Sequence, residues 1–159
     1  MSLREKSAVW WIIALSIVFF FFEIVFLAIN PELIKYFAIS SSNFLSGKYI
    51  WTILVHIFSH GGFFHLLVNM FALFSLGTLT ERIIGRKRFA WFYLISGIFA
   101  GLLSVFLAGF FGFGFWEKVF GSPDVYMLGA SGAIFGVAGL LVMILPRIRF
   151  SIIFIPFFS

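Results

Sequence analysis

Four polar side chains that can bind protons or donate hydrogen bonds lie close together in an otherwise apolar part of the sequence. They are His56, His60, His65 and Asn69. At about 100° per residue, His65 and Asn69 share one face of a helix, and so do His56 and His60 if that stretch is helical. The two pairs then lie roughly 180° apart on one continuous helix. Imidazole and carboxamide groups can bind a metal ion, move a proton or donate hydrogen bonds, and polar groups within a membrane span indicate function by default.

The spacing of the histidines argues against a metal site. Three imidazoles on one continuous helix do not converge, although a helix break at Gly61-Gly62 would bring them closer. Zinc would need ligands from elsewhere, and the acids beyond the N-terminus form no ligand motif with the histidines; these acids are Glu23, Glu32, Glu81, Glu117 and Asp124. We therefore predict no metal and no cofactor. A purely structural role, in hydrogen bonds between helices or to interfacial water, stays open for these polar groups.

A second candidate is the run of small residues Gly129-Ala130-Ser131-Gly132. Gly132 and Gly136 have a spacing typical of closely packed membrane helices, in which a serine usually serves packing or hydrogen bonding. Glycines around a serine are also typical of a nucleophile, because they let a substrate backbone approach the hydroxyl. The run by itself is compatible with either role.

The composition excludes a water-soluble globular fold. Of the 159 residues, 62% are hydrophobic and 11% are charged, whereas soluble domains are roughly 45–50% apolar and about 25% charged. A core of this size does not bury so many aromatic and aliphatic side chains, so much of the surface must face lipid. The sequence contains no cysteine, which excludes disulfides and a cysteine nucleophile.

Four apolar segments qualify as membrane-spanning helices, which need roughly 20 apolar residues each. They are residues 9–29, 62–79, 89–113 and 127–145. A fifth, residues 150–158, would rise roughly 14 Å as a helix, which is under half of a core about 30 Å thick. Without linkers or repeats, residues 1–159 are predicted to form one all-α polytopic membrane domain with four full spans and a partial fifth, and we expect it to be truncated at its C-terminus.

The basic residues lie at the ends of these spans and not in one patch. One set of alternating span ends carries Arg4, Lys6, Arg82, Arg86, Lys87, Arg88, Arg147 and Arg149, and the other carries Lys35, Lys48 and Lys118. By the positive-inside rule, the N-terminus, residues 82–88 and residues 147–149 are predicted to lie in the cytoplasm. The protein is thus predicted to be a multi-pass cell-membrane protein, and its basic balance requires no nucleic-acid partner. Loop 30–55 then faces outward, and its aromatic residues predict partial embedding in the membrane interface.

This topology brings the two polar motifs together. The second and fourth spans both begin on the outer side, so His65, Asn69 and Ser131 are predicted at similar depth. A serine at a helix N-terminus, with an imidazole and a carboxamide beside it, has the parts of a nucleophile and an oxyanion site.

Taken in order, these motifs resemble the rhomboid family of intramembrane serine proteases. The resemblance covers nearly the whole chain and rests on Trp51, on the series from His56 to Asn69, on Glu81-Arg82-Ile83-Ile84-Gly85 and on Gly129-Ala130-Ser131-Gly132. It implies a six-helix core that cleaves transmembrane proteins near the extracytoplasmic membrane surface. The implied chemistry uses a Ser-His dyad without metal or cofactor.

The resemblance also implies roles for individual residues. Ser131 would be the nucleophile, and its backbone N–H would form the oxyanion site with the side chains of His65 and Asn69. Loop 30–55 would be the membrane-embedded hairpin of the family. The substrate cleft would be surrounded by Gly129, Ala130, Gly132 and Phe135, and the structural polar residues would be His56, His60 and Glu81.

Three positions depart from the family pattern. Thr52 stands where the family usually has arginine, and Phe135 stands where many members have tyrosine. No histidine follows His65, whereas the general base of the family lies in its sixth span. We therefore expect that base beyond Ser159 and expect residues 1–159 alone to be inactive. The alternatives are a rhomboid-like protein that binds transmembrane helices without cleaving them, and a small channel or metal-handling protein that uses the three histidines.

Two acids lie within or at the end of a predicted span. Glu23 lies past the middle of the first span, and we expect it to reach the outer interface or to pair with loop 30–55, since an acid in a span needs a partner or water. Glu81, together with Arg82, is expected to make structural contacts at the end of the second span.

Overall fold

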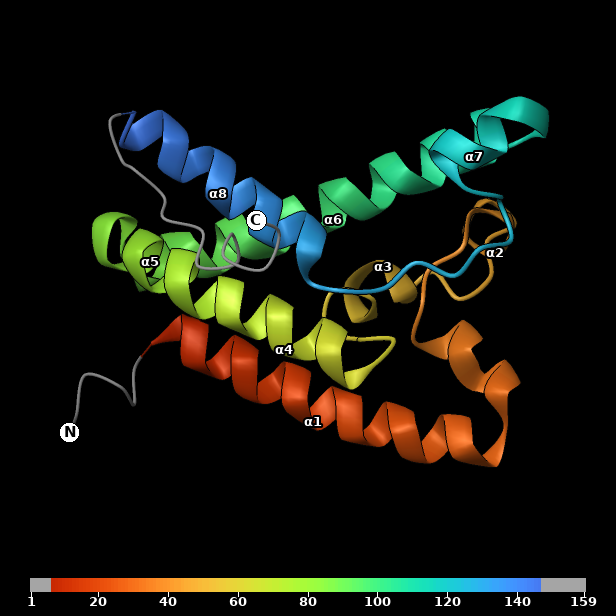
Figure 1. The fold of residues 1–159 in the computed structure, drawn as a ribbon, viewed down its shortest axis with the longest axis horizontal. Coiled ribbons are helices and arrows are strands. Elements are labelled where there is room, and N and C mark those ends of the chain that lie inside the picture. Colours follow the sequence, from red (N-terminus) through yellow and green to blue (C-terminus); the bar gives the residue numbers. More distant parts are fainter. Residues whose placement is uncertain (1–6, 147–159) are drawn as a thin grey trace, which may run out of the picture.

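Three long apolar helices dominate the computed structural model, which describes residues 7–146 (Figure 1). The first is α1 (Ala8–Ile29). The second, Phe63–Ile84, is continuous but changes pitch, from α4 (Phe63–Ala72) through the π-helical η3 (Leu73–Gly77) to α5 (Thr78–Ile84). The third is α6 (Arg86–Phe111). Each is long and apolar enough to cross a membrane, and the predicted all-α polytopic fold is confirmed.

The connections contain short helices. Between α1 and α4 lie η2 (Pro31–Tyr36), α2 (Ser41–Leu45) and α3 (Thr52–Val55). Between α6 and the last described helix, α8 (Ser131–Ile144), lie η4 (Gly114–Trp116) and α7 (Glu117–Phe120). Tyr49 and Trp51 pack edge to face with ring centroids 5.5 Å apart, which gives the segment before α3 an aromatic surface of the kind that favours a membrane interface.

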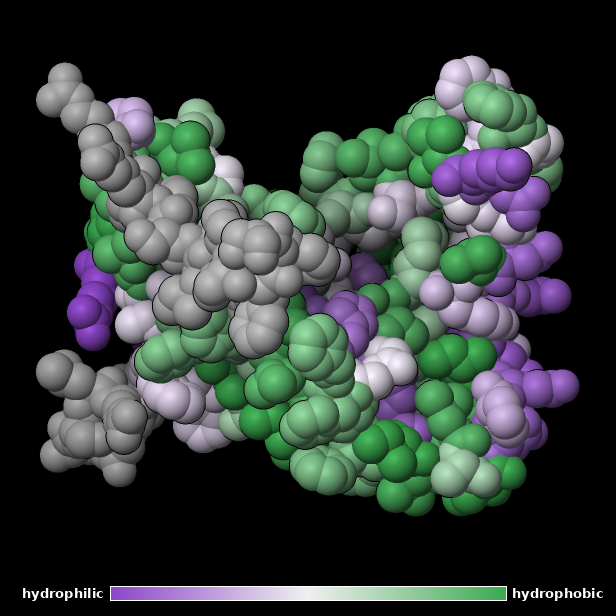
Figure 2. Space-filling model, in the orientation of Figure 1, coloured by the Kyte–Doolittle hydropathy of each residue, from purple (hydrophilic) through white to green (hydrophobic). Residues whose placement is uncertain are grey.

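The second span lies between the first and the last described helices. Helices α1 and α4 run side by side in Figure 1, and α8 lies along α6, with which it makes the most extensive helix contact. The π-helical segment η3 touches both α1 and α8. Figure 2 shows hydrophobic side chains over the visible lateral surface and hydrophilic ones mainly toward the two ends of the molecule. This distribution fits a protein that lies in a bilayer with its helix ends at the interfaces.

The fourth predicted span is shorter than expected. Helix α8 has 14 residues, which is roughly 21 Å of helix, because the backbone before Ser131 is extended and bonded elsewhere. Ile39 and Met127 pair through N···O distances of 3.0 and 2.8 Å, and Gly129 N–H donates to the His56 carbonyl at 2.8 Å. The predicted fifth segment, residues 150–158, lies outside the described residues.

Glu81, near the end of α5, closes the start of α1. Its two carboxylate oxygens accept hydrogen bonds from Ser7 Oγ at 2.8 Å, Ala8 N at 2.9 Å and Val9 N at 3.0 Å. The first N–H groups of a helix have no partner within the helix, and a negative charge there is favoured by the helix dipole. The Ser7 side chain makes no capping hydrogen bond to its own helix. Glu81, which is 72 to 74 positions later in the sequence, supplies the helix cap instead.

Replacing Glu81 is therefore expected to weaken the packing of α1. Glu81→Ala removes three charge-assisted hydrogen bonds and should lower the free energy of unfolding by about 1–3 kcal/mol. The measurement is reversible unfolding in detergent micelles. The control is Glu117→Ala, which removes an exposed acid from α7. Equal stability of the two variants would contradict the capping role.

Candidate active site

Ser131 is the first residue of α8 and its side chain is exposed, whereas the preceding Ala130 is fully buried. The backbone N–H groups in the first turn of a helix have no partner within the helix, and the helix dipole makes this end partly positive. An oxygen that develops negative charge beside Ser131 would meet these groups. The start of α8 is therefore suited to binding an oxyanion.

The imidazole of His65 lies against Gly129, two residues before Ser131. A Cβ atom placed on Gly129 would be 2.8 Å from His65 Cε1 and 2.9 Å from His65 Nε2, and 3.9 Å from Ser131 Oγ. The ring edge and the hydroxyl thus lie around the same point. Gly129 has φ +127°, so this position excludes other residues both by its backbone conformation and by the close approach of His65.

Asn69 lies one turn into α4 from His65 and is bonded to it. Its Nδ2 donates to the His65 carbonyl at 2.8 Å, and its side chain is buried. A carboxamide has two N–H donors, so one donor remains besides this bond. The shared helix face predicted for His65 and Asn69 is found in the structure, because both lie within the continuous helix α4.

His56 lies against α6. Its Nδ1–H donates to the Thr52 carbonyl at 2.8 Å, and a Cβ on Gly101 would lie 2.8 Å from His56 Nε2. Burial lowers the pKa of His56, with hydrogen bonds to the backbone opposing this shift. A cavity of about 110 Å³ joins His56 to Ser131 and is also lined by Ser104 and Gly132.

His60 contacts His65 and not His56. Helix α3 ends at Val55, so the helical face that would have aligned His56 with His60 does not form. His60 Nδ1–H donates to the Phe58 carbonyl at 3.0 Å, and the His60 and His65 rings meet edge to face at a centroid distance of 5.3 Å. Burial lowers the pKa of His60 to about 4, so its imidazole is neutral near pH 7. Within residues 7–146 no three His, Asp or Glu side chains gather as metal ligands do.

Phe135 lies one turn beyond Ser131 on the same face of α8 and is 78% exposed. Its side chain is not part of the cavity between His56 and Ser131. The Phe135 side chain thus lies outside this cavity, which Ser131 lines together with residues of α6.

The close contact between α6 and α8 depends on small residues. A Cβ on Gly132 would lie 2.5 Å from Ala100 Cβ, and a Cβ on Gly136 would lie 2.6 Å from Ser96 Cβ. The neighbouring face of α6 receives the segment before α4 in the same way, since a Cβ on Gly97 would lie 2.7 Å from Ile57 Cδ1. The sequence reasoning identified the glycines of α8 but missed Gly97 and Gly101, although their four-residue spacing is the same signal.

The structure is thus that of a helical membrane protein with a serine at the start of a helix and a histidine beside it. Comparison with known proteins identifies the family. The model of the Rhomboid domain matches residues 47–159. The chain belongs to the rhomboid family.

Several curated relatives share this family. The chain is 34% identical over 133 residues to Rhomboid protease GluP of Bacillus subtilis (strain 168), covering 83% of the chain and 23% of GluP. It is 29% identical over 171 residues to the mitochondrial presenilin-associated rhomboid-like protein of Rattus norvegicus, covering 99% of the chain and 41% of that protein. The putative rhomboid protease YdcA of Bacillus subtilis (strain 168) is 37% identical over 98 residues. The chain thus spans less than half the length of the first two relatives.

The packing at Gly132 predicts a sharp difference between two glycines of α8. Gly132→Ala should lower the free energy of unfolding by about 1–3 kcal/mol, because the added methyl group forces α8 away from Ala100. Gly139→Ala is the matched control, since a Cβ there meets nothing within 4 Å. Unfolding in detergent micelles measures both, and a Gly132→Ala variant as stable as Gly139→Ala would contradict the contact.

Proposed function

We propose that this protein is an intramembrane serine endopeptidase that cleaves transmembrane proteins. The observation that carries the proposal is the meeting of His65 and Ser131 around Gly129 at the start of α8. Membership of the rhomboid family supports it, since the relatives include GluP, which is named a protease. In this proposal Ser131 Oγ attacks the scissile carbonyl of the substrate.

The oxyanion that forms would be stabilised by three donors. These are the backbone N–H of Ser131, the imidazole of His65 and the carboxamide of Asn69. Donors that are already in place when charge develops cost no reorganisation, and the bond from Asn69 Nδ2 to the His65 backbone carbonyl holds the Asn69 carboxamide against its own helix. Gly129 and Gly132 would border the substrate cleft and let His65 and α6 approach Ser131 closely, whereas Glu81 and His56 would hold the helices in position.

The general base is assigned outside the three histidines of residues 1–159. His65 is proposed as an oxyanion donor, and His56 and His60 each donate Nδ1–H to a backbone carbonyl. In the family pattern the base is a histidine of the sixth span, so activity has to be tested in the full-length protein. No cofactor is part of this mechanism.

We further propose the orientation in the membrane. The eight basic residues at one set of span ends favour a cytoplasmic N-terminus and a cytoplasmic turn at residues 82–88. The start of α8 then opens toward the extracytoplasmic side, where substrates would be cut near the membrane surface. The substrates in this proposal are transmembrane proteins, which approach through the lipid bilayer.

Ser131→Ala is expected to abolish activity of the full-length protein without loss of folding, because it removes only an exposed hydroxyl. Labelling by a fluorophosphonate and cleavage of a transmembrane test substrate should both fall by about 1,000-fold or more. Ser75→Ala, which removes another exposed hydroxyl from the second span, is the control. Undiminished cleavage by Ser131→Ala would overturn the nucleophile, and a folded wild-type protein that is never labelled would favour a rhomboid-like protein that binds helices without cleaving them.

Asn69→Ala tests the oxyanion site. It should lower kcat roughly 10- to 1,000-fold, the upper part of this range being the usual loss for one oxyanion donor. Steady-state cleavage in micelles gives kcat and KM, with Asn43→Ala on α2 as the control. A change confined to KM would count against this role.

A further inference from the structure

Glu23 is a buried carboxyl group within a membrane-length helix. It lies six residues before the end of α1, is the only ionisable acid or base in that helix, and is 2% exposed. Burying such a group among apolar side chains is costly unless it makes a hydrogen bond. The expectation that Glu23 reaches the membrane interface or pairs with loop 30–55 is therefore wrong, and its partner lies elsewhere.

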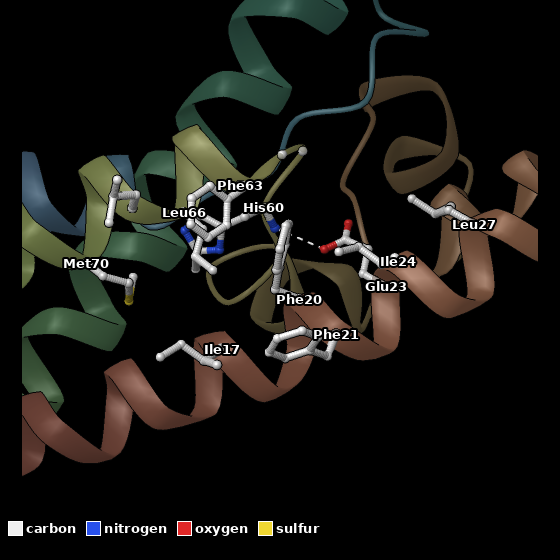
Figure 3. Close-up of a pocket in the computed structure, with 13 residues that line it drawn as sticks. Ile17, Phe20, Phe21, Glu23, Ile24, Leu27, His60, Phe63, Leu66 and Met70 are labelled. Atoms are coloured by element: carbon white, nitrogen blue, oxygen red, sulfur yellow. Dashed lines mark hydrogen bonds between the residues drawn. The ribbon is translucent and has the colours of Figure 1, made fainter.

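The partner of Glu23 is the backbone of His60. Glu23 Oε2 accepts a hydrogen bond from His60 N–H at 3.0 Å, as Figure 3 shows, and Oε1 is buried without a partner among the described residues. Apolar side chains from α1 and α4 surround the pair, with Phe20 and Leu66 among them. The carboxyl group of Glu23 thus makes a hydrogen bond that joins α1 to the segment before α4.

Before His60 the same segment is held by apolar contacts, since Phe58 meets Phe19 of α1 at a ring-centroid distance of 5.9 Å and Ile57 packs on Gly97 of α6. His60 lies between the end of α3 and the start of α4, outside any helix, and Gly61-Gly62 follow it. Glycine has more backbone freedom than other residues, so a fixed point at His60 limits how the turn can move. The hydrogen bond from His60 Nδ1 to Phe58 stays within the segment and does not attach it to another helix.

His60 is in contact with a residue of the candidate active site. The His60 ring packs edge to face on His65, and the edge of the His65 ring lies against Gly129 beside Ser131. We propose that Glu23 is a positioning residue, whose carboxyl group holds the His60 backbone so that the His60 ring sets the place of His65 at Ser131. This inference rests on the proposed function. It connects α1, which supplies no residue to the oxyanion site, to the geometry of that site.

The test compares Glu23→Gln with Glu23→Leu in the full-length protein. Glutamine keeps an acceptor oxygen at the same reach, so kcat should stay within about threefold of the wild type. Leucine keeps most of the volume and removes the acceptor, so kcat should fall about 10- to 100-fold with little change in KM, as expected for a misplaced catalytic group. Phe21→Leu, on an exposed face of α1, is the control.

The outcomes separate this inference from the proposed function. A wild-type protein without Ser131-dependent turnover would overturn both. With wild-type turnover established, an unchanged kcat in Glu23→Leu, or an equal loss of kcat in Glu23→Gln and Glu23→Leu, would overturn the positioning role alone. If Glu23→Leu does not fold in micelles, Glu23→Asp decides: its carboxyl group is one methylene shorter and falls short of His60 N–H, so wild-type kcat in this variant would also overturn the inference.

Discussion

The candidate site depends on the absence of side chains at two positions next to Ser131. Gly132 allows α8 to approach Ala100 of α6 so closely that a Cβ atom would lie 2.5 Å away. Gly129 allows His65 to approach the backbone and holds a φ of +127° that ends the extended segment. Lipid tails are as apolar as the side chains of the helices, so the hydrophobic effect does not drive helices together within a membrane. Close backbone approach and van der Waals contact supply most of the attraction instead. The same small residues that pack the bundle therefore place the serine.

Polar side chains connect the helices at a few defined points. Glu81 joins the end of the second span to the start of α1, and Glu23 joins α1 to the segment before α4. His56 accepts the Gly129 N–H through its backbone carbonyl, which attaches the approach to α8 to the segment before α4. Each bond supplies a partner for a group that could not be left unpaired in an apolar environment. Together they fix the relative positions of helices whose lateral contacts are otherwise apolar and weakly directional.

The three histidines illustrate how one sequence motif divides into different tasks. His56 packs on Gly101 and belongs to the α6 side, His60 is buried and bonded between α1 and α4, and His65 is exposed beside Ser131. Their separation follows from the end of α3 at Val55 and from the start of α4 at Phe63. The match to the Rhomboid domain establishes the family of the protein. The proposed chemistry rests on the proximity of His65 and Ser131 around Gly129.

The sequence alone predicted an all-α membrane protein with long apolar helices, because a helix that crosses a bilayer requires about 20 apolar residues, but it overestimated the fourth span, where the structure has the 14-residue α8. It also determined that His65 and Asn69 share a face, since residues four apart within one helix must do so. Only the tertiary structure decided where α8 begins, because that depends on the pairing of Met127 with Ile39, and which groups Glu23 and Glu81 contact. These partners are 37 or more positions apart, and no local pattern encodes them. Periodicity and length act within a segment, whereas hydrogen bonds between distant segments depend on how closely packed helices come together.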